Sequence, residues 1–193
     1  MAILITGAAG LVGSSFSHWV AENKPECVII GIDDLSGGYL DNVSQDIFFF
    51  KENLLQHDLD SIFQKFDIDV IYHFAAYAAE GLSPFMRTFN YNNNLVTSAR
   101  LISLAIKYSV KRFVFTSSMA VYGAGAPPFS EEDAPAPVDP YGIAKYAVEL
   151  DLHVAYAQHG LEYCIIRPHN IYGPRQNIWD RYRNVLGIWM NQH

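Results

Sequence analysis

Two hydroxyl groups, a phenol and an ammonium lie at opposite ends of the segment 117–145. Ser117 and Ser118 begin it, and Tyr141 and Lys145 end it within the run PYGIAK, after a loop rich in proline and acidic residues. If residues 140–160 form a helix, Tyr141 and Lys145 are one turn apart and share a face of it. A free phenol, with a pKa of about 10, is a poor base at neutral pH, but a neighbouring ammonium favours the phenolate. The spacing therefore predicts a tyrosine that can act as a base.

A second group of residues has the spacing of a phosphate-binding turn. Gly7, Gly10 and Gly13 follow the first apolar run, AILIT, and open a helical segment. Glycine permits a tight turn and a close approach to a pyrophosphate, which the N–H groups at the helix N-terminus then bind. The next apolar run ends at Asp33, where a carboxylate accepts hydrogen bonds from the adenosine ribose, and no arginine follows to hold a 2′-phosphate. The pattern predicts a dinucleotide site that prefers NAD to NADP.

Short apolar runs must form the frame that positions these residues. They cover 2–6, 27–33, 46–50, 69–74, 112–118 and 162–168. Four of the six are continuously apolar, which is typical of parallel strands covered on both faces. Helical segments alternate with them, at 10–23, 93–109 and 140–160. The alternation predicts an α/β fold, a doubly wound parallel sheet of about six to seven strands with ligands at the carboxyl ends of its strands.

The composition excludes several classes of function. Half of the 193 residues are hydrophobic, 17% are charged and the net charge is −7, so we expect a packed core and no nucleic-acid partner. Cys27 and Cys164 lie in apolar runs and the histidines are scattered, so we expect buried free thiols and no metal site, with His73 as a strand residue. No apolar run reaches a membrane-spanning length and AILITG is a strand rather than a leader, so we expect a soluble, cytoplasmic protein without a membrane partner.

The first glycine loop has the spacing Gly-x-x-Gly-x-x-Gly, and with it the chain resembles a known family. It is similar to the extended short-chain dehydrogenases/reductases, in particular the NAD-dependent nucleotide-sugar epimerases and dehydratases of the UDP-glucose 4-epimerase type. The resemblance covers essentially all 193 residues. The motifs that carry it are TGAAGLVGS, GIDDLSGG, HFAAYA, FTSSMAVYG, PYGIAK and RPHNIYGPRQN.

The resemblance implies a role for individual residues. Ser118, Tyr141 and Lys145 form the catalytic group of that family, and Ser118 and Asn170 contact the nucleotide-sugar substrate. The implied NAD-binding residues are Gly7, Gly10, Leu11, Val12, Gly13, Asp33, Asn53, Leu54, Ala75, Ala76, Asn94, Tyr141, Lys145 and Pro168. Three positions depart from the family pattern: Asn53 replaces an aspartate, Thr97 replaces a common glycine, and Ala78 replaces a basic residue of some epimerases.

The resemblance also implies the reaction, an NAD-dependent epimerisation, most simply of a UDP-hexose at C4. Tyr141 takes the proton of the sugar hydroxyl while hydride passes to NAD⁺. The resulting 4-keto intermediate rotates within the site, and hydride then returns to its other face. Dehydratases carry an acidic pair directly after the serine position, where this chain has Met119 and Ala120, so dehydration is disfavoured. The alternatives are a catalytically incomplete NAD-binding fragment of such an enzyme, or a keto-sugar reductase or dehydratase of the same superfamily. Asp33 argues against an NADPH-using reductase.

Members of the family continue beyond this length with a half that closes over the nucleotide sugar. We therefore expect an NAD-binding Rossmann domain at 1–175 and the start of a truncated substrate-binding region at 176–193, with measurable NAD binding and no epimerase turnover by this chain alone. The stretch 178–193 predicts one amphipathic helix with Trp179 and Trp189 uncovered.

The resemblance finally implies a homodimer through a four-helix bundle. The helices expected to pair lie at about 90–107 and 141–159. The residues expected at the seam are Leu101, Ala105, Val148, Leu152 and Ala155.

Overall fold

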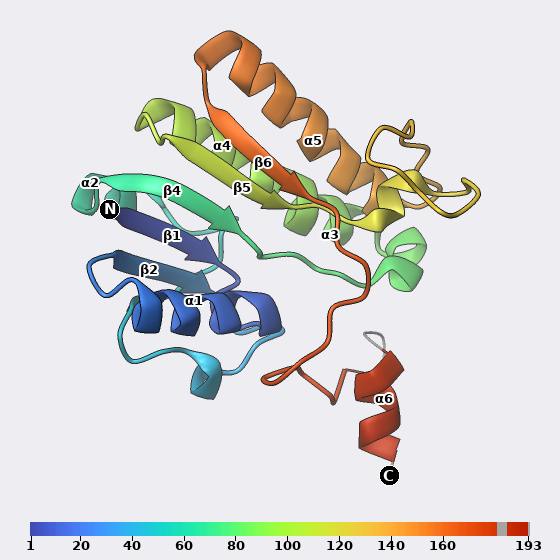
Figure 1. Cartoon of the computed structure of the whole chain (residues 1–193), viewed down its shortest axis with the longest axis horizontal. Coiled ribbons are helices and arrows are strands. Elements are labelled where there is room, and N and C mark those ends of the chain that lie inside the picture. Colours follow the sequence, from blue (N-terminus) through green and yellow to red (C-terminus); the bar gives the residue numbers. More distant parts are fainter. Residues whose placement is uncertain (181–184, 193) are drawn as a thin grey trace.

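A parallel sheet forms the centre of the computed structural model, which describes residues 1–180 and 185–192 (Figure 1). Its six strands are β1 (Ala2–Thr6), β2 (Val28–Asp33), β3 (Phe48–Lys51), β4 (Ile68–His73), β5 (Arg112–Thr116) and β6 (Glu162–Ile166). Their order is β3-β2-β1-β4-β5-β6, so the winding direction changes between β1 and β4. In doubly wound sheets this is where a crevice opens at the carboxyl ends of the strands. The expected fold class is confirmed.

Helices cover both faces of the sheet (Figure 1). On one face lies α1 (Leu11–Asn23), and on the other lie α2 (Asp60–Lys65), α3 (Arg87–Tyr91), α4 (Thr97–Lys107) and α5 (Pro140–His159). Three 3₁₀ turns are η1 (Leu40–Asn42), η2 (Glu80–Phe85) and η4 (Met119–Tyr122), and a π-helical turn, η3 (Asn92–Val96), joins α3 to α4. The helix α6 (Val185–Gln192) lies away from the sheet, past the carboxyl ends of its strands (Figure 1).

Two hydrophobic cores flank the sheet because successive residues of a strand point to opposite faces. One core brings Leu4 and Phe113 of the sheet against Leu152 of α5. The other brings Ile5 of β1 against Val20 of α1. Strands buried on both sides need apolar residues at successive positions, which is why the runs in the sequence are continuous.

The residues expected at a dimer seam lie inside the core of this monomer, so the prediction of which residues form the seam is wrong. Leu101, Ala105, Val148, Leu152 and Ala155 are at most 4% exposed and belong to the core between α4, α5 and the sheet. Both helices carry apolar residues on more than one side, and periodicity alone does not say which side meets the sheet. The large apolar residues exposed on α3, the turn η3 and α5 are Phe89, Val96, Ile143, Leu150, Val154 and Tyr156.

The terminal helix begins later than the sequence predicts. The residues Ile178, Trp179 and Asp180 precede α6 and are not helical, and residues 181–184 and 193 lie outside the described part of the chain. The side chain of Asn177 accepts the N–H of Trp179 at 3.0 Å, and such a local bond favours a turn over a helix. Trp179 and Trp189 are both exposed, as expected.

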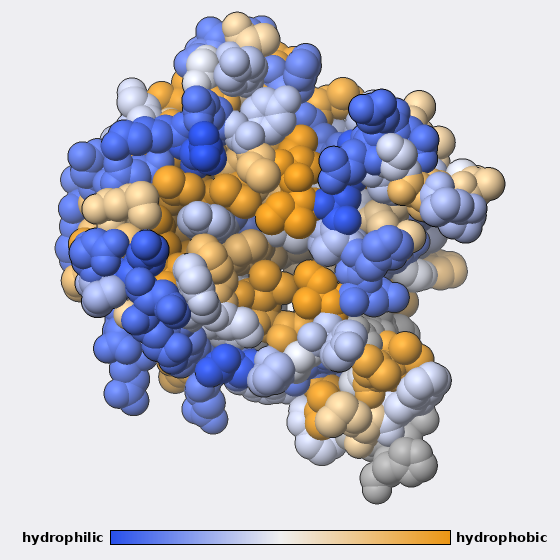
Figure 2. Space-filling view, viewed as in Figure 1, coloured by the Kyte–Doolittle hydropathy of each residue, from blue (hydrophilic) through white to orange (hydrophobic). Residues whose placement is uncertain are grey.

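The cysteines are unpaired, but the expectation that both thiols are buried is wrong, because Cys27 is half-buried and Cys164 is exposed. Cys164 lies on β6, one of the two edge strands, while α1 covers the opposite end of the same side of the sheet. Figure 2 shows apolar side chains gathered in the middle of this side, between α1 and β6, and again over α6. Within the residues that the structure describes, no helix is both long and apolar enough to cross a bilayer.

Candidate active site

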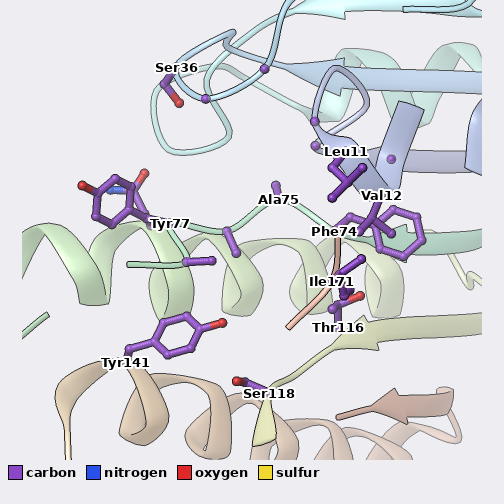
Figure 3. Close-up of a pocket in the computed structure, with 18 of the residues that line it drawn as sticks. Leu11, Val12, Ser36, Phe74, Ala75, Tyr77, Thr116, Ser118, Tyr141 and Ile171 are labelled. Atoms are coloured by element: carbon purple, nitrogen blue, oxygen red, sulfur yellow. The ribbon is translucent and has the colours of Figure 1, made fainter. Parts of the chain in front are cut away.

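A cavity of about 780 Å³ opens at the carboxyl ends of the strands (Figure 3). Loops after β2 and β3 form one end of it, the loop after β1 forms its middle, and α5 with the segments after β5 and β6 forms the other end. Almost every site residue that the sequence predicts lines it: Gly7, Gly10, Leu11, Val12, Gly13, Asp33, Asn53, Leu54, Ala75, Ala76, Ser118, Tyr141, Lys145, Pro168 and Asn170. The sheet topology therefore brings together residues that are far apart in the sequence.

The glycine loop has no room for side chains. Gly7 adopts a left-handed φ of 71° and donates its N–H to the carbonyl of Ile32 at 2.9 Å. A Cβ on Gly13 would lie 2.1 Å from the carbonyl oxygen of Gly7. The helix α1 starts here with Gly10 as its N-cap and without a side-chain cap, so the N–H groups of its first turn face the cavity uncapped. This is the environment that an anionic phosphate group requires.

Two carboxylates mark the end of the cavity after β2. Asp33 accepts the N–H of Ala9 at 3.0 Å and that of Leu35 at 2.8 Å, so its carboxylate is tied to the glycine loop. Burial raises the pKa of the neighbouring Asp34, but hydrogen bonds from Ser36 and Asn53 outweigh it and hold this pKa below its usual value. Both groups therefore present negative charge, which disfavours a phosphate at this end.

The predicted catalytic residues meet at the other end of the cavity. Tyr141 projects from α5, and Ser118 lies directly after β5 (Figure 3). Lys145, one turn further along α5, also lines the cavity. Asp139 caps α5 by accepting the N–H groups of Tyr141 and Gly142, at 2.8 and 3.0 Å, which fixes where the helix starts. The hydroxyl oxygen of Ser118 accepts the N–H of Ala120 at 3.1 Å, so its own O–H remains able to donate.

Lys145 is almost completely buried. Its Nζ donates to the carbonyl of Thr116 at 2.8 Å and lies 4.8 Å from the ring centre of Phe115 and 5.8 Å from that of Tyr141. Burial lowers the pKa of Lys145 to about 7, against the opposing charge of Glu149, which raises it. A lysine whose pKa lies near neutral pH, next to a phenol, is typical of a catalytic site.

Asn94, which the resemblance implies as a cofactor contact, is not among the residues that line the cavity. Its amide accepts the N–H of Tyr77 at 2.9 Å and donates to the carbonyl of Tyr77 at 3.1 Å and to Asn90 at 2.7 Å. Asn90 in turn donates to the carbonyl of Pro140, the first residue of α5. In this structure Asn94 therefore holds the loop after β4 against the start of the catalytic helix.

The π-helical turn η3 accounts for this position of Asn94. One extra residue in the turn rotates the positions that follow it, and such turns often occur at functional sites. Asn93 and Thr97 face the cavity on either side of Asn94. The sequence predicts a regular helix over 93–109 and gives no sign of the turn.

Three further features of the site are not predicted from the sequence. Gly38 packs onto the glycine loop so closely that a Cβ would lie 2.4 Å from the carbonyl of Ala9, and the pair Gly37-Gly38 after β2 is the signal that indicates it. Thr116 lines the cavity, and its buried Oγ1 has no hydrogen-bond partner among the described residues. A buried ion pair joins Glu149 to Arg167 behind Lys145, and no local pattern reveals it.

These features fit a bound dinucleotide. The side-chain-free loop and the uncapped helix N-terminus can bind a pyrophosphate, and Asp33 can accept hydrogen bonds from ribose hydroxyls. The unpaired hydroxyl of Thr116 could form a hydrogen bond with a polar group of the ligand. The fold and the cavity together define a dinucleotide-binding α/β domain with a Tyr–Lys pair at one end of its cofactor site. The model of the NAD dependent epimerase/dehydratase family matches residues 3–192, and the chain belongs to that family.

Relatives of known name agree with this assignment. The UDP-glucose 4-epimerase of Halalkalibacterium halodurans is 33% identical over 92% of this chain and 53% of its own length. The dTDP-D-glucose 4,6-dehydratase of Dictyostelium discoideum is 30% identical over 95% of this chain and 48% of its own length. The solved structure of the Thermotoga maritima UDP-glucose 4-epimerase with UDP-glucose is 32% identical and covers 100% of this chain and 62% of that one, with a TM-score of 0.94. The chain thus spans about half the length of the curated relatives it matches.

Proposed function

We propose that this chain is the NAD-binding part of a nucleotide-sugar epimerase that acts at C4 of a UDP-hexose. The observation that carries the proposal is that a single cavity joins the glycine loop and Asp33 to the Tyr141–Lys145 pair and Ser118. A dinucleotide bound along it would have its adenosine end at Asp33 and its reactive end at Tyr141. The similarity to UDP-glucose 4-epimerases supports the choice of substrate.

The side chains at the reactive end suit proton transfer at a sugar hydroxyl. Bound NAD would supply the reversible oxidation of the sugar carbon. Tyr141 would take the hydroxyl proton on its phenol oxygen, and the ammonium form of Lys145 would stabilise the phenolate. Because the Ser118 oxygen already accepts the N–H of Ala120, its O–H would donate to the reacting oxygen and hold it near the phenol.

Epimerisation is preferred to dehydration because of the residues after Ser118. Met119 lines the cavity and Ala120 follows it in the turn η4. Neither side chain can give or take a proton, whereas removal of water from a sugar needs an acid at the leaving hydroxyl. Epimerisation returns the same atoms to the same carbon and needs no such group.

Two measurements test the proposal. Calorimetric titration should give tighter binding of NAD⁺ than of NADP⁺, and failure to bind NAD⁺ would refute it. Any form of the protein that converts UDP-galactose to UDP-glucose, this chain or a longer one that contains it, should lose the activity in Tyr141→Phe and keep it in Tyr146→Phe, a matched tyrosine on the same helix. NAD⁺ binding without any turnover by the 193 residues would instead support the alternative of a catalytically incomplete fragment, which the share of the relatives' length favours.

We extend the proposal to a homodimer through α4 and α5, with a seam other than the one first expected. Ile143, Leu150 and Val154 are exposed at a spacing that keeps them on one face of α5, and Val96 is exposed at the start of α4. Pairing two copies would bury this face. Sedimentation of Leu150→Glu should give a monomer where the unaltered chain gives a dimer; a monomer in both would remove the proposal.

The division of the chain and its compartment are also proposals. Residues 1–175 would form the NAD-binding domain and residues 176–193 the start of the substrate-binding region, with Gln176 and Asn177 already lining the cavity. Limited proteolysis near residue 176 that abolished NAD⁺ binding would contradict this division. The unpaired cysteines support a reducing compartment such as the cytoplasm, which cell fractionation would test.

A further inference from the structure

A buried ion pair lies directly behind the catalytic lysine. Glu149 follows Lys145 by one turn of α5, and its side chain is 5% exposed. Arg167, just after β6, binds both carboxylate oxygens of Glu149, through Nε at 3.0 Å and through a terminal nitrogen at 2.5 Å. Ser117, which immediately precedes Ser118, also donates to this carboxylate. The pair thus connects the segment after β6 to the two segments that carry the catalytic residues, α5 and the end of β5.

Arg167 has further contacts that fix its position. A terminal nitrogen donates to the hydroxyl of Tyr122 at 2.9 Å, and the guanidinium lies 4.9 Å from the centre of that ring. The hydrogen bonds with Glu149 raise the pKa of Arg167 despite its partial burial, so the guanidinium stays charged over the whole pH range in which Lys145 titrates. Glu149 is therefore held by a fixed cation in a place where its charge still acts on Lys145.

We propose that Glu149 and Arg167 are positioning residues that together set the charge of Lys145: Glu149 stabilises the ammonium, and Arg167 limits how strongly it does so. Among the described residues, few groups face Lys145. His73 at the end of β4 is neutral, Tyr141 shares its helix face, and the Thr116 carbonyl accepts its hydrogen bond. Glu149 is the acid that acts on Lys145 through its charge. Arg167 is the cation that partly neutralises Glu149.

The consequence for catalysis rests on the proposed function. Only the ammonium form of Lys145 stabilises the phenolate of Tyr141, and burial alone opposes that form. Without Glu149, more of the protein would hold a neutral lysine at neutral pH. Without Arg167, the ammonium would persist to higher pH.

The charge of Lys145 can be measured without substrate or cofactor. Its side-chain resonance in lysine-labelled protein, assigned by its loss in Lys145→Met, is followed by NMR from about pH 5 to pH 10. Glu149→Gln should lower the pKa of Lys145 by about one pH unit, and Arg167→Gln should raise it by a similar amount. Asp151→Asn, which removes a carboxylate from another side of α5, is the matched control and should leave it unchanged.

The opposite directions separate this role from a structural one, because both substitutions break the same ion pair. Equal shifts in one direction, or no shift in either variant, would overturn the proposal. If Glu149→Gln does not fold, Arg167→Gln alone decides, since an unchanged or lowered pKa of Lys145 there also overturns it. Failure to bind NAD⁺ would count against the proposed function and leave this result unaffected.

Discussion

Mild acid should destabilise this protein through a single buried histidine. His73 ends β4 with its Nδ1 2.6 Å from the hydroxyl of Thr6 and its Nε2 2.9 Å from that of Ser98. Ser98 donates its own proton to the carbonyl of Asn94, so it must accept from Nε2–H, and Nδ1 accepts from Thr6. The neutral ring therefore satisfies every partner. Burial and the nearby charge of Lys145 lower the pKa of His73 to about 3.

The size of the effect follows from the difference between the folded and unfolded pKa. The unfolded chain takes up this proton near pH 6.5 and the folded chain only near pH 3, so the stability from His73 is complete above pH 6.5 and is lost as the pH falls below it. The loss is about 1.4 kcal/mol for each pH unit, or about 2 kcal/mol between pH 6.5 and pH 5. Lys145, whose pKa is lowered to about 7, changes stability only above that value.

Urea unfolding at pH 6.5 and pH 5 measures this loss directly. The unaltered chain should lose about 2 kcal/mol of unfolding free energy between the two values. The variant His73→Gln carries a neutral side chain at both pH values. It should be less stable than the unaltered chain at pH 6.5, but its unfolding free energy should change little between pH 6.5 and pH 5. His159→Gln, at the exposed end of α5, should behave like the unaltered chain. An equal loss in His73→Gln would refute the reasoning, because the titrating group would then lie elsewhere.

Three further substitutions test the cofactor site and the core. Gly13→Ala adds a methyl group 2.1 Å from a backbone oxygen and should weaken NAD⁺ binding by calorimetry at least tenfold, about 1.4 kcal/mol; an unchanged affinity would contradict the close packing of the glycine loop. Asp33→Asn keeps the shape but removes the charge, so the preference for NAD⁺ over NADP⁺ should fall; an unchanged preference would disprove the role of Asp33. Leu152→Ala should lower the unfolding free energy by about 2–5 kcal/mol in urea titrations, and Leu150→Ala, which is exposed, by well under that; similar losses would contradict the packing of α5.

The sequence by itself determined the features that depend on local spacing. Once α5 is a helix, its 3.6-residue period places Tyr141 and Lys145 on one face, whatever the rest of the chain does. The glycines at 7, 10 and 13 likewise follow a strand directly and open a helix, so their meeting with Asp33 required only that β1 and β2 be neighbours. The short apolar runs predicted all six strands, and four of them are continuous, because burial on both faces leaves a mark in each covered strand separately.

Only the tertiary structure decided the features that depend on which distant segments meet. Val148 and Leu150 are both apolar residues of α5, yet the sheet buries the first and leaves the second exposed. Asn94 hydrogen-bonds the backbone of Tyr77 from within a π-helical turn that is invisible in the sequence. Arg167 pairs with Glu149 because β6 lies beside β5, which places the end of β6 next to α5. Periodicity is a property of one segment, whereas a partner across the sheet depends on the order of the strands, which no single segment encodes.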